Sequence, residues 1–128
     1  MNRGVAISVC ALACVLSIGG SLFAHHGGAA WDNKTTVNVQ GTVTEFRFVN
    51  PHVQIFLDAD EKGKTVKWRC ESADPAMLVR QGWTHDMLKA GDHVTLVGHP
   101  AKSGVKIMVL EKLILASGKE VPAKGVVN

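Results

Sequence analysis

The feature that most constrains the fold of this chain is the order of its alternating segments. From Thr35 onward apolar and polar residues alternate with period two, which is typical of strands with one buried face. Three such segments precede a short segment of helical period, and two more follow it. This order predicts a mainly β, five-stranded OB-like barrel with a short helical segment between its third and fourth strands. A partly open antiparallel sheet with a helix across one end has the same element order and stays an alternative.

The first of these strands is long and changes its apolar phase near Thr44 and Glu45, so we expect a bulge and a bend there. Asn50-Pro51 ends the strand, because proline has no N–H to donate to a ladder. The later strands are expected over 52–58, 65–71, 92–98 and 105–115.

The helical segment has its own start and stop signals. Asp74 is a good N-cap, Pro75 suits the first helical position, and Gly82 is placed to end the helix. We expect the barrel domain to occupy residues 35–118. The polar stretch 119–128 is expected to be a loose tail, with a short edge strand around residues 120–121 as an option.

The first 24 residues have the pattern of a cleaved secretory signal peptide. Arg3 supplies the positive end, an apolar run extends from Val5 to Ile18, and Ala24 is the small residue before the expected cut. The sequence therefore predicts export, with the periplasm as the expected destination. A retained membrane anchor and a lipoprotein cut before Cys14 are alternatives, although the apolar run is short for a spanning helix.

Cleavage after Ala24 leaves 104 residues, which is enough for one small domain and too few for two. The mature chain would keep Cys70 alone, so it could form no internal disulfide. The whole chain has a formal net charge of +3. That weak excess, together with export, argues against nucleic acid as a partner, and no transmembrane segment is expected in the mature chain.

The expected cut exposes a free amine on His25, next to His26. An amine and an imidazole can chelate one metal ion, and nitrogen donor sets suit Cu(II). Residues 25–34 are expected to form a flexible arm, so His52 or His99 from the barrel could complete the site. Glu71 could orient one of these histidines. The alternative is that the histidine pair is merely solvated.

A second candidate site lies on the expected outer face of the first three strands. OB-type barrels bind ligands on this face, and in an exported protein the partner would be a small ligand or an envelope protein. Solvated strand faces have similar composition, so ordinary surface is the alternative. The residues of this face are Arg47, Gln54, Phe56, Lys67 and Arg69.

The sequence carries no motif of a known catalytic type: no nucleophile elbow, no phosphate-binding glycine loop and no zinc-type Cys/His spacing. Cys70 shares its strand phase with Val66 and Trp68, so we expect it to be buried rather than reactive. The chain is therefore expected to be a binding protein and not an enzyme.

A set of short motifs is spread over nearly the whole chain after the leader. They are Ala24-His25-His26, Gly41-Thr42-Val43, Asn50-Pro51-His52, Trp68 with Glu71, Gly82-Trp83, Leu88, Gly91-Asp92 and Gly98 to Gly104. This combination resembles DUF6152, a functionally uncharacterised family of small exported bacterial proteins. The resemblance implies export and one small β-rich domain, and it implies no activity. Gly27-Gly28 stands where the family usually has Ser-Phe.

Overall fold

The computed structural model describes residues 28–125, and strands dominate this part of the chain. Each predicted strand is present, with its ends shifted by at most three residues. Within the described range, no helix is long and apolar enough to span a bilayer. In chain order the elements are η1 (Gly28–Ala30), β1 (Val37–Arg47), β2 (Gln54–Glu61), β3 (Lys64–Glu71), α2 (Pro75–Val79), β4 (His93–Pro100), β5 (Ile107–Ile114) and β6 (Glu120–Pro122).

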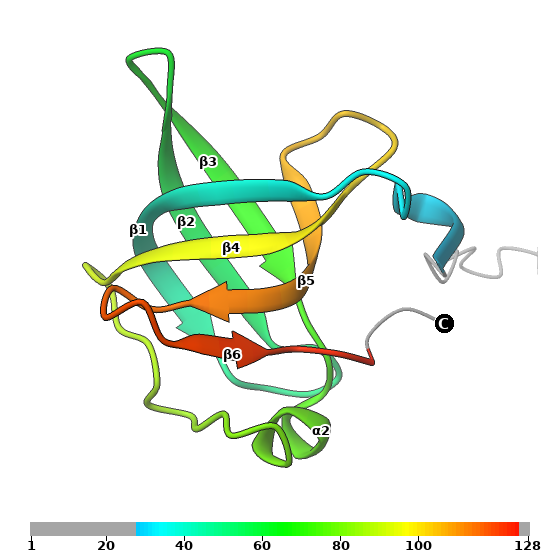
Figure 1. The fold of residues 1–128 in the computed structure, drawn as a ribbon, viewed down its shortest axis with the longest axis vertical. Helices are drawn as coiled ribbons and strands as arrows, with labels where there is room; N and C mark the ends of the chain where they lie inside the picture. Colours follow the sequence, from blue (N-terminus) through cyan, green and yellow to red (C-terminus); the bar gives the residue numbers. More distant parts are fainter. Residues whose placement is uncertain (1–27, 126–128) are drawn as a thin grey trace, which may run out of the picture.

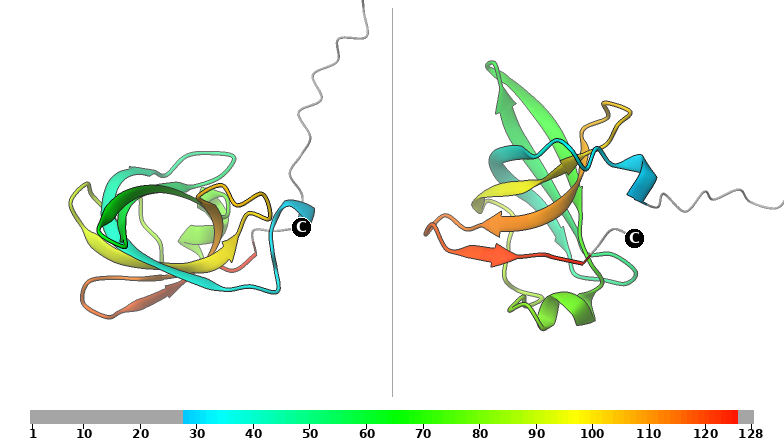
Figure 2. Two further views of the ribbon diagram at one scale, coloured as in Figure 1. Left: turned by 90° about the horizontal axis from the view of Figure 1, so that it is seen from above. Right: turned by 45° about the vertical axis from the view of Figure 1, so that its right-hand side comes forward.

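Five of the strands close into a barrel (Figures 1 and 2). β1 pairs with β2 and β4, β2 pairs with β3, and β4 pairs with β5, all antiparallel. The ring closes where β5 runs parallel to β3 over a short stretch. The predicted five-stranded OB-like barrel is therefore confirmed, with its one short helix between β3 and β4. β6 lies outside the ring on the edge of β5.

β1 bends, and so pairs with a different neighbouring strand along each of its halves. Its first half pairs with β4 and its second half with β2, and the two halves overlap at Gly41 and Thr42. The register shifts between Val43 and Glu45, which confirms the predicted bulge. A side chain at Gly41 would collide with the backbone of Asp58, so glycine allows the close strand approach at this bend.

The barrel interior holds the apolar phase of each strand. Ile55 and Leu57 of β2 and Trp68 and Cys70 of β3 are buried, as predicted for Cys70 from its strand phase. Each fully buried large aliphatic side chain contributes about 1.5–3 kcal/mol to stability, so the core stabilises the domain without a disulfide. β4 and β5 add Val94, Leu96, Met108, Leu110 and Leu113 to it.

The helix α2 lies across one end of the barrel (Figure 1). The carboxylate of Asp74 accepts a hydrogen bond of 2.9 Å from the amide of Met77, so the predicted N-cap is confirmed, with Pro75 in the first turn. Leu78 points into the core. After the helix, Trp83 is buried as well.

The segment after residue 118 packs on the barrel, and the edge strand offered as an option around residues 120–121 is present. β6 forms over Glu120–Pro122, and Val121 and Ala123 are buried. The indole N–H of Trp83 donates to the carbonyl of Pro122 at 2.8 Å. The apolar residues of this stretch alternate with polar ones, as in a strand. The polar composition of the same stretch favours a loose tail, and that signal is misleading here.

The close approach of β4 and β5 at Gly98 can be tested by substitution. A Cβ at Gly98 would overlap the carbonyl oxygen of Val109 on β5, so Gly98→Ala should lower the free energy of unfolding by about 3 kcal/mol. At Gly104 a Cβ would meet open space, and only its φ of +80° opposes a side chain. Gly104→Ala should cost about 1 kcal/mol. Equal losses in urea unfolding of the two variants would contradict this view of the β4–β5 contact.

Candidate functional site

The candidate site is a pocket of about 370 Å³ on the outside of the barrel. Its walls are the end of β3, the loop between β4 and β5, the first residue of β5, the last residue of η1 and the residue that follows it. Figure 1 shows η1 beside this loop. The pocket thus lies where the parallel β3–β5 pairing closes the barrel, on a side where OB-type barrels take ligands.

One wall is formed by the chain that precedes β1. Trp31 pairs with Ala101 in an isolated β-bridge, and its side chain is buried. The amide of Asp32 donates to Pro100 at 2.9 Å, and the amide of Lys102 donates to Ala30 at 3.0 Å. The described part of the predicted arm is therefore docked on the β4–β5 loop.

The lining is mostly apolar. Trp31, Ala101, Val105 and Ile107 contribute hydrocarbon surface, and Val105 is among the few large apolar side chains that are well exposed. An apolar concavity with a few polar groups is the usual composition of a small-molecule site.

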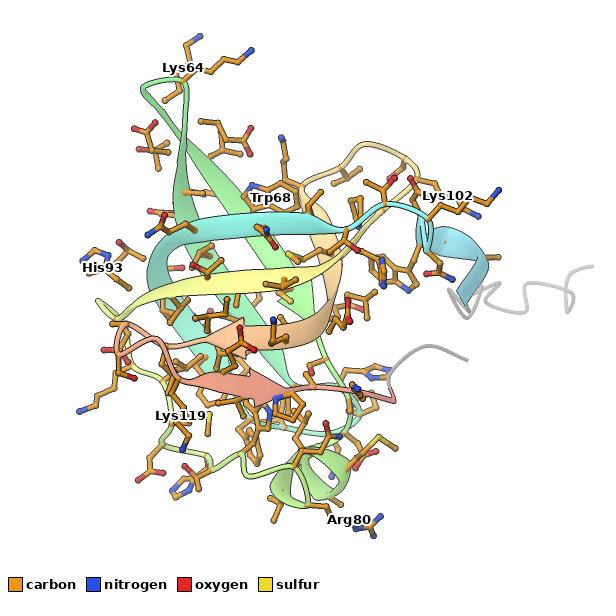
Figure 3. The ribbon with its side chains drawn as sticks, viewed as in Figure 1. Lys64, Trp68, Arg80, His93, Lys102 and Lys119 are labelled. Atoms are coloured by element: carbon orange, nitrogen blue, oxygen red, sulfur yellow. The ribbon has the colours of Figure 1, made fainter. Side chains whose placement is uncertain are left out.

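Charged groups from β3 form the polar part of the pocket. A guanidinium nitrogen of Arg69, Nη2, lies 3.2 Å from a carboxylate oxygen of Glu71. The Nε of Arg69 is buried and has no hydrogen-bond partner within residues 28–125. Lys102, which Figure 3 shows beside η1, and Ser103 complete the lining. The pocket therefore contains two cationic side chains and one anionic one, with a donor left unused.

A small cluster fixes the second half of the loop. One oxygen of Glu61 accepts from the indole of Trp68 at 2.8 Å, and the other accepts from the ammonium of Lys106 at 2.7 Å. Lys106 also lies 5.0 Å above the Trp68 ring. The bond from Lys106, together with that from Trp68, lowers the pKa of Glu61. The cluster ties Lys106 to the β2–β3 hairpin and so positions its neighbours Val105 and Ile107.

The predicted outer face is assembled by strand pairing, but only one of its residues lines the pocket. Arg47 lies opposite Gln54, and Phe56 lies opposite Arg69. The Arg47 guanidinium is 4.7 Å from the Phe56 ring centroid and is bound to Glu45. Lys67 forms an ion pair of 3.1 Å with Asp58. Arg69 alone reaches the pocket.

Of the predicted metal ligands, the structure describes His52 and His99, and these two do not belong to one cluster of possible ligands. His25 and His26 lie outside the described residues. The Nδ1 of His52 is 3.2 Å from the carbonyl of Ser72, whereas that of His99 is 2.9 Å from the carbonyl of Thr35. Between residues 28 and 125 no group of three or more His, Cys, Asp or Glu side chains is arranged to hold a metal ion.

Glu71 and Cys70 are neighbours at the end of β3. Glu71 pairs with Arg69, and no histidine nitrogen of the described chain lies within ion-pair distance of it, so its role as a histidine partner stays a prediction. Cys70 is buried as predicted. Burial raises the pKa of its thiol well above the usual value, and the Glu71 charge raises it further, which makes the thiolate scarce at neutral pH.

Comparison with known proteins identifies a family but no activity. A family model, DUF6152, described as a family of unknown function, matches residues 11–109, and the predicted resemblance is thereby confirmed. No match was found among curated proteins.

Two solved structures are similar in part. The first is a complex of TiaS with an isoleucine tRNA and ATP, with 24% identity, a TM-score of 0.48 and coverage of 66% of this chain and 18% of that chain. The second is a ZRD-deleted mutant of TiaS in complex with agmatine, with 24% identity, a TM-score of 0.49 and coverage of 73% of this chain and 23% of that chain. This chain spans about a fifth of their length. Because both TM-scores are below 0.5, we assign nothing to this chain from either protein.

The docked wall of the pocket can be tested by removing its anchor. Trp31→Ala should leave the barrel folded but release the segment before β1, since the buried indole holds it. Loss of that burial removes about 3 kcal/mol of the free energy that holds the segment in place. Hydrogen exchange at the amides of Asp32 and Lys102 should therefore accelerate about a hundredfold. Unchanged protection of both amides, with the β1–β4 ladder as the internal control, would show that Trp31 does not anchor the wall.

The Glu61 cluster predicts a pH dependence. A lowered pKa of Glu61 in the folded state stabilises the protein at pH values above 4.5, the ordinary pKa of the carboxyl group. This stabilisation is lost as the pH falls through the lowered pKa. Glu61→Gln keeps an oxygen for Trp68 but removes the charge. It should therefore be less stable than the unsubstituted protein at pH 7 and equally stable in acid. Glu120→Gln, in the exposed Lys112–Glu120 pair, is the control. A stability difference for Glu61→Gln that is constant from pH 7 to pH 3 would contradict the prediction.

Proposed function

The chain belongs to the DUF6152 family, whose function is unknown, and from that premise we propose that it is an exported binding protein that holds an amphipathic anion in the pocket beside β3. The ligand has an apolar body, which the pocket lining accommodates, and an anionic group, which Arg69 binds. Binding is its role, and catalysis is not.

The observation that carries this proposal is the Arg69 side chain in the lining of a mostly apolar pocket, together with its Nε, which has no hydrogen-bond partner among the described residues. A buried N–H without a partner is costly, so a ligand that accepts from it gains binding free energy. Carboxylate, sulfonate and phosphate groups suit guanidinium donors. Lys102 adds a second positive charge at the rim, while Glu71 offsets only one of the two.

The volume of the pocket supports a small ligand. About 370 Å³ lies in the range of roughly 300–1,000 Å³ that is usual for small-molecule sites. A protein partner would instead require a broad apolar surface, and the exposed large apolar residues of the described chain are scattered over three segments, at Val49, Val79 and Val105.

Export is supported by the leader sequence that ends at Ala24. In an exported protein the binding site faces the envelope or the medium, where small amphipathic anions are encountered. The mature chain would begin at His25, three residues before the first described residue, Gly28.

A second candidate function is chelation of copper by His25 and His26. It is favoured by the course of the chain, because the segment after Gly28 is docked against the end of β4. Residues 30–32 therefore lie beside the end of β4, the strand that carries His99. The amine of His25 would be a ligand only after cleavage of the leader.

The anion proposal is tested with 8-anilinonaphthalene-1-sulfonate, a fluorescent aromatic sulfonate. Arg69→Gln should weaken its binding about tenfold, since a charge-assisted hydrogen bond is lost. Val105→Asp should weaken it as well, because a carboxylate would then stand in the exposed apolar rim. Arg47→Gln is the matched control, since Arg47 lies on the same outer face but is bound to Glu45 and does not line the pocket.

Fluorescence titration and thermal unfolding are measured for all variants. If Arg69→Gln and Val105→Asp bind the probe as tightly as Arg47→Gln does, while remaining folded, then the probe binds elsewhere and the pocket is not the ligand site.

A further inference from the structure

Arg69 is engaged by its anionic neighbour at a single nitrogen. Its Nη2 lies 3.2 Å from an oxygen of Glu71, two residues further along β3. In the Arg47–Glu45 pair of β1, by contrast, Nε and Nη2 donate to both carboxylate oxygens, at 2.6 Å and 3.0 Å. Such a two-point contact occupies one edge of the guanidinium. The contact with Glu71 is less complete, so Arg69 keeps donors for a second acceptor.

Glu71 lines the same pocket as Arg69 and is held on a rigid part of the barrel. Its backbone is flanked on both sides, because Glu71 lies opposite Gln54 on β2 and opposite Val109 on β5. The Glu71 side chain is 26% exposed, and that of Arg69 is 42% exposed. A partly buried charge is screened less than a fully exposed one. The negative charge of Glu71 therefore acts on any ligand that binds to Arg69.

An anion bound to Arg69 has Glu71 as a near neighbour. Both contact nitrogens of one guanidinium group, and these nitrogens share a single carbon atom. Like charges repel, and the repulsive free energy is proportional to the charge of the ligand. The cost of removing an ion from water also rises, with the square of its charge. Glu71 therefore opposes a doubly charged headgroup more strongly than a singly charged one.

The other charge in the pocket lining is that of Lys102, on the loop between β4 and β5. Figure 3 shows Lys102 on the outside of the molecule, beside η1, so its charge lies at the rim. The lining as a whole has two positive charges and one negative charge. A ligand with one negative charge balances this sum.

We propose that Glu71 sets the charge selectivity of the pocket, favouring amphipathic monoanions such as sulfonates and carboxylates relative to dianions such as phosphate monoesters. This inference rests on the proposed function, since it requires that an anion bind at Arg69, and it narrows the class of ligand. The ordinary alternative is an ion pair that only stabilises the end of β3. That alternative predicts no effect of Glu71 on selectivity.

The test compares two probes that share a naphthalene body, naphthalene-1-sulfonate and 1-naphthyl phosphate. It is done at pH 8, where the sulfonate carries one negative charge and the phosphate about two. Dissociation constants are obtained from chemical-shift titrations by nuclear magnetic resonance. The backbone amides of Trp31 and Lys102 are followed, because both residues line the pocket and their shifts locate each probe.

Glu71→Gln should tighten binding of the sulfonate about threefold and that of the phosphate about tenfold. The second factor is about the square of the first, because the electrostatic free energy is twice as large for the doubly charged probe. Glu71→Asp keeps the charge, so it should keep the ratio of the two dissociation constants close to that of the unsubstituted protein. A purely structural role of Glu71 would not produce this dependence on probe charge.

Glu45→Gln is the matched control. Glu45 also pairs with an arginine two residues away, Arg47, but neither residue lines the pocket, so both dissociation constants should stay unchanged. Thermal unfolding of each variant shows whether it remains folded, and Glu71→Gln is expected to do so because glutamine has the shape of glutamate.

The outcomes separate this inference from the function on which it rests. Arg69→Gln is titrated with both probes, and weaker binding of both supports the anion site. If it weakens both while Glu71→Gln changes the two constants by one common factor, or weakens both probes, the selectivity role of Glu71 is overturned and the anion site stands. If Arg69→Gln binds both probes as tightly as the unsubstituted protein does, the anion site and the selectivity role are both overturned.

Discussion

The arrangement of this barrel depends on the short parallel pairing of β3 with β5. Arg69, Cys70 and Glu71 align with Ile107, Met108 and Val109, and this contact closes the barrel. It also brings Arg69 and Glu71 beside Ile107 and the loop that precedes it. Without closure there would be an open sheet with a helix at one end, and the pocket would lack a wall. The β3–β5 pairing therefore both closes the core and forms the candidate site.

Much of the fold follows from local signals. Strand period, the N-cap at Asp74 and the phase change before Glu45 are physical constraints that act within a few residues, and the structure confirms each of them. Composition was a weaker guide. The polar stretch after residue 118 was expected to be loose because of its polar and glycine content, yet Val121 and Ala123 alternate into the core.

The site was predictable only in part, because it is made by contacts between distant segments. Arg69 could be found from its strand phase. The pocket itself depends on Trp31 packing against Ala101, and neither the register of that bridge nor the unused Nε of Arg69 has a local sequence signal. Strand pairing places Arg47 opposite Gln54 and Phe56 opposite Arg69, whereas ion pairs with Glu45 and Asp58 occupy Arg47 and Lys67.

The central claim is that Arg69 donates to a bound anion from inside the pocket, and side-chain nuclear magnetic resonance tests it most directly. In a titration with the aromatic sulfonate, the Nε–H signal of Arg69 should shift saturably, as its unused donor gains an acceptor. The corresponding signal of Arg47, already bonded to Glu45, should stay in place. An Arg69 signal that remains unshifted at saturation would contradict the account.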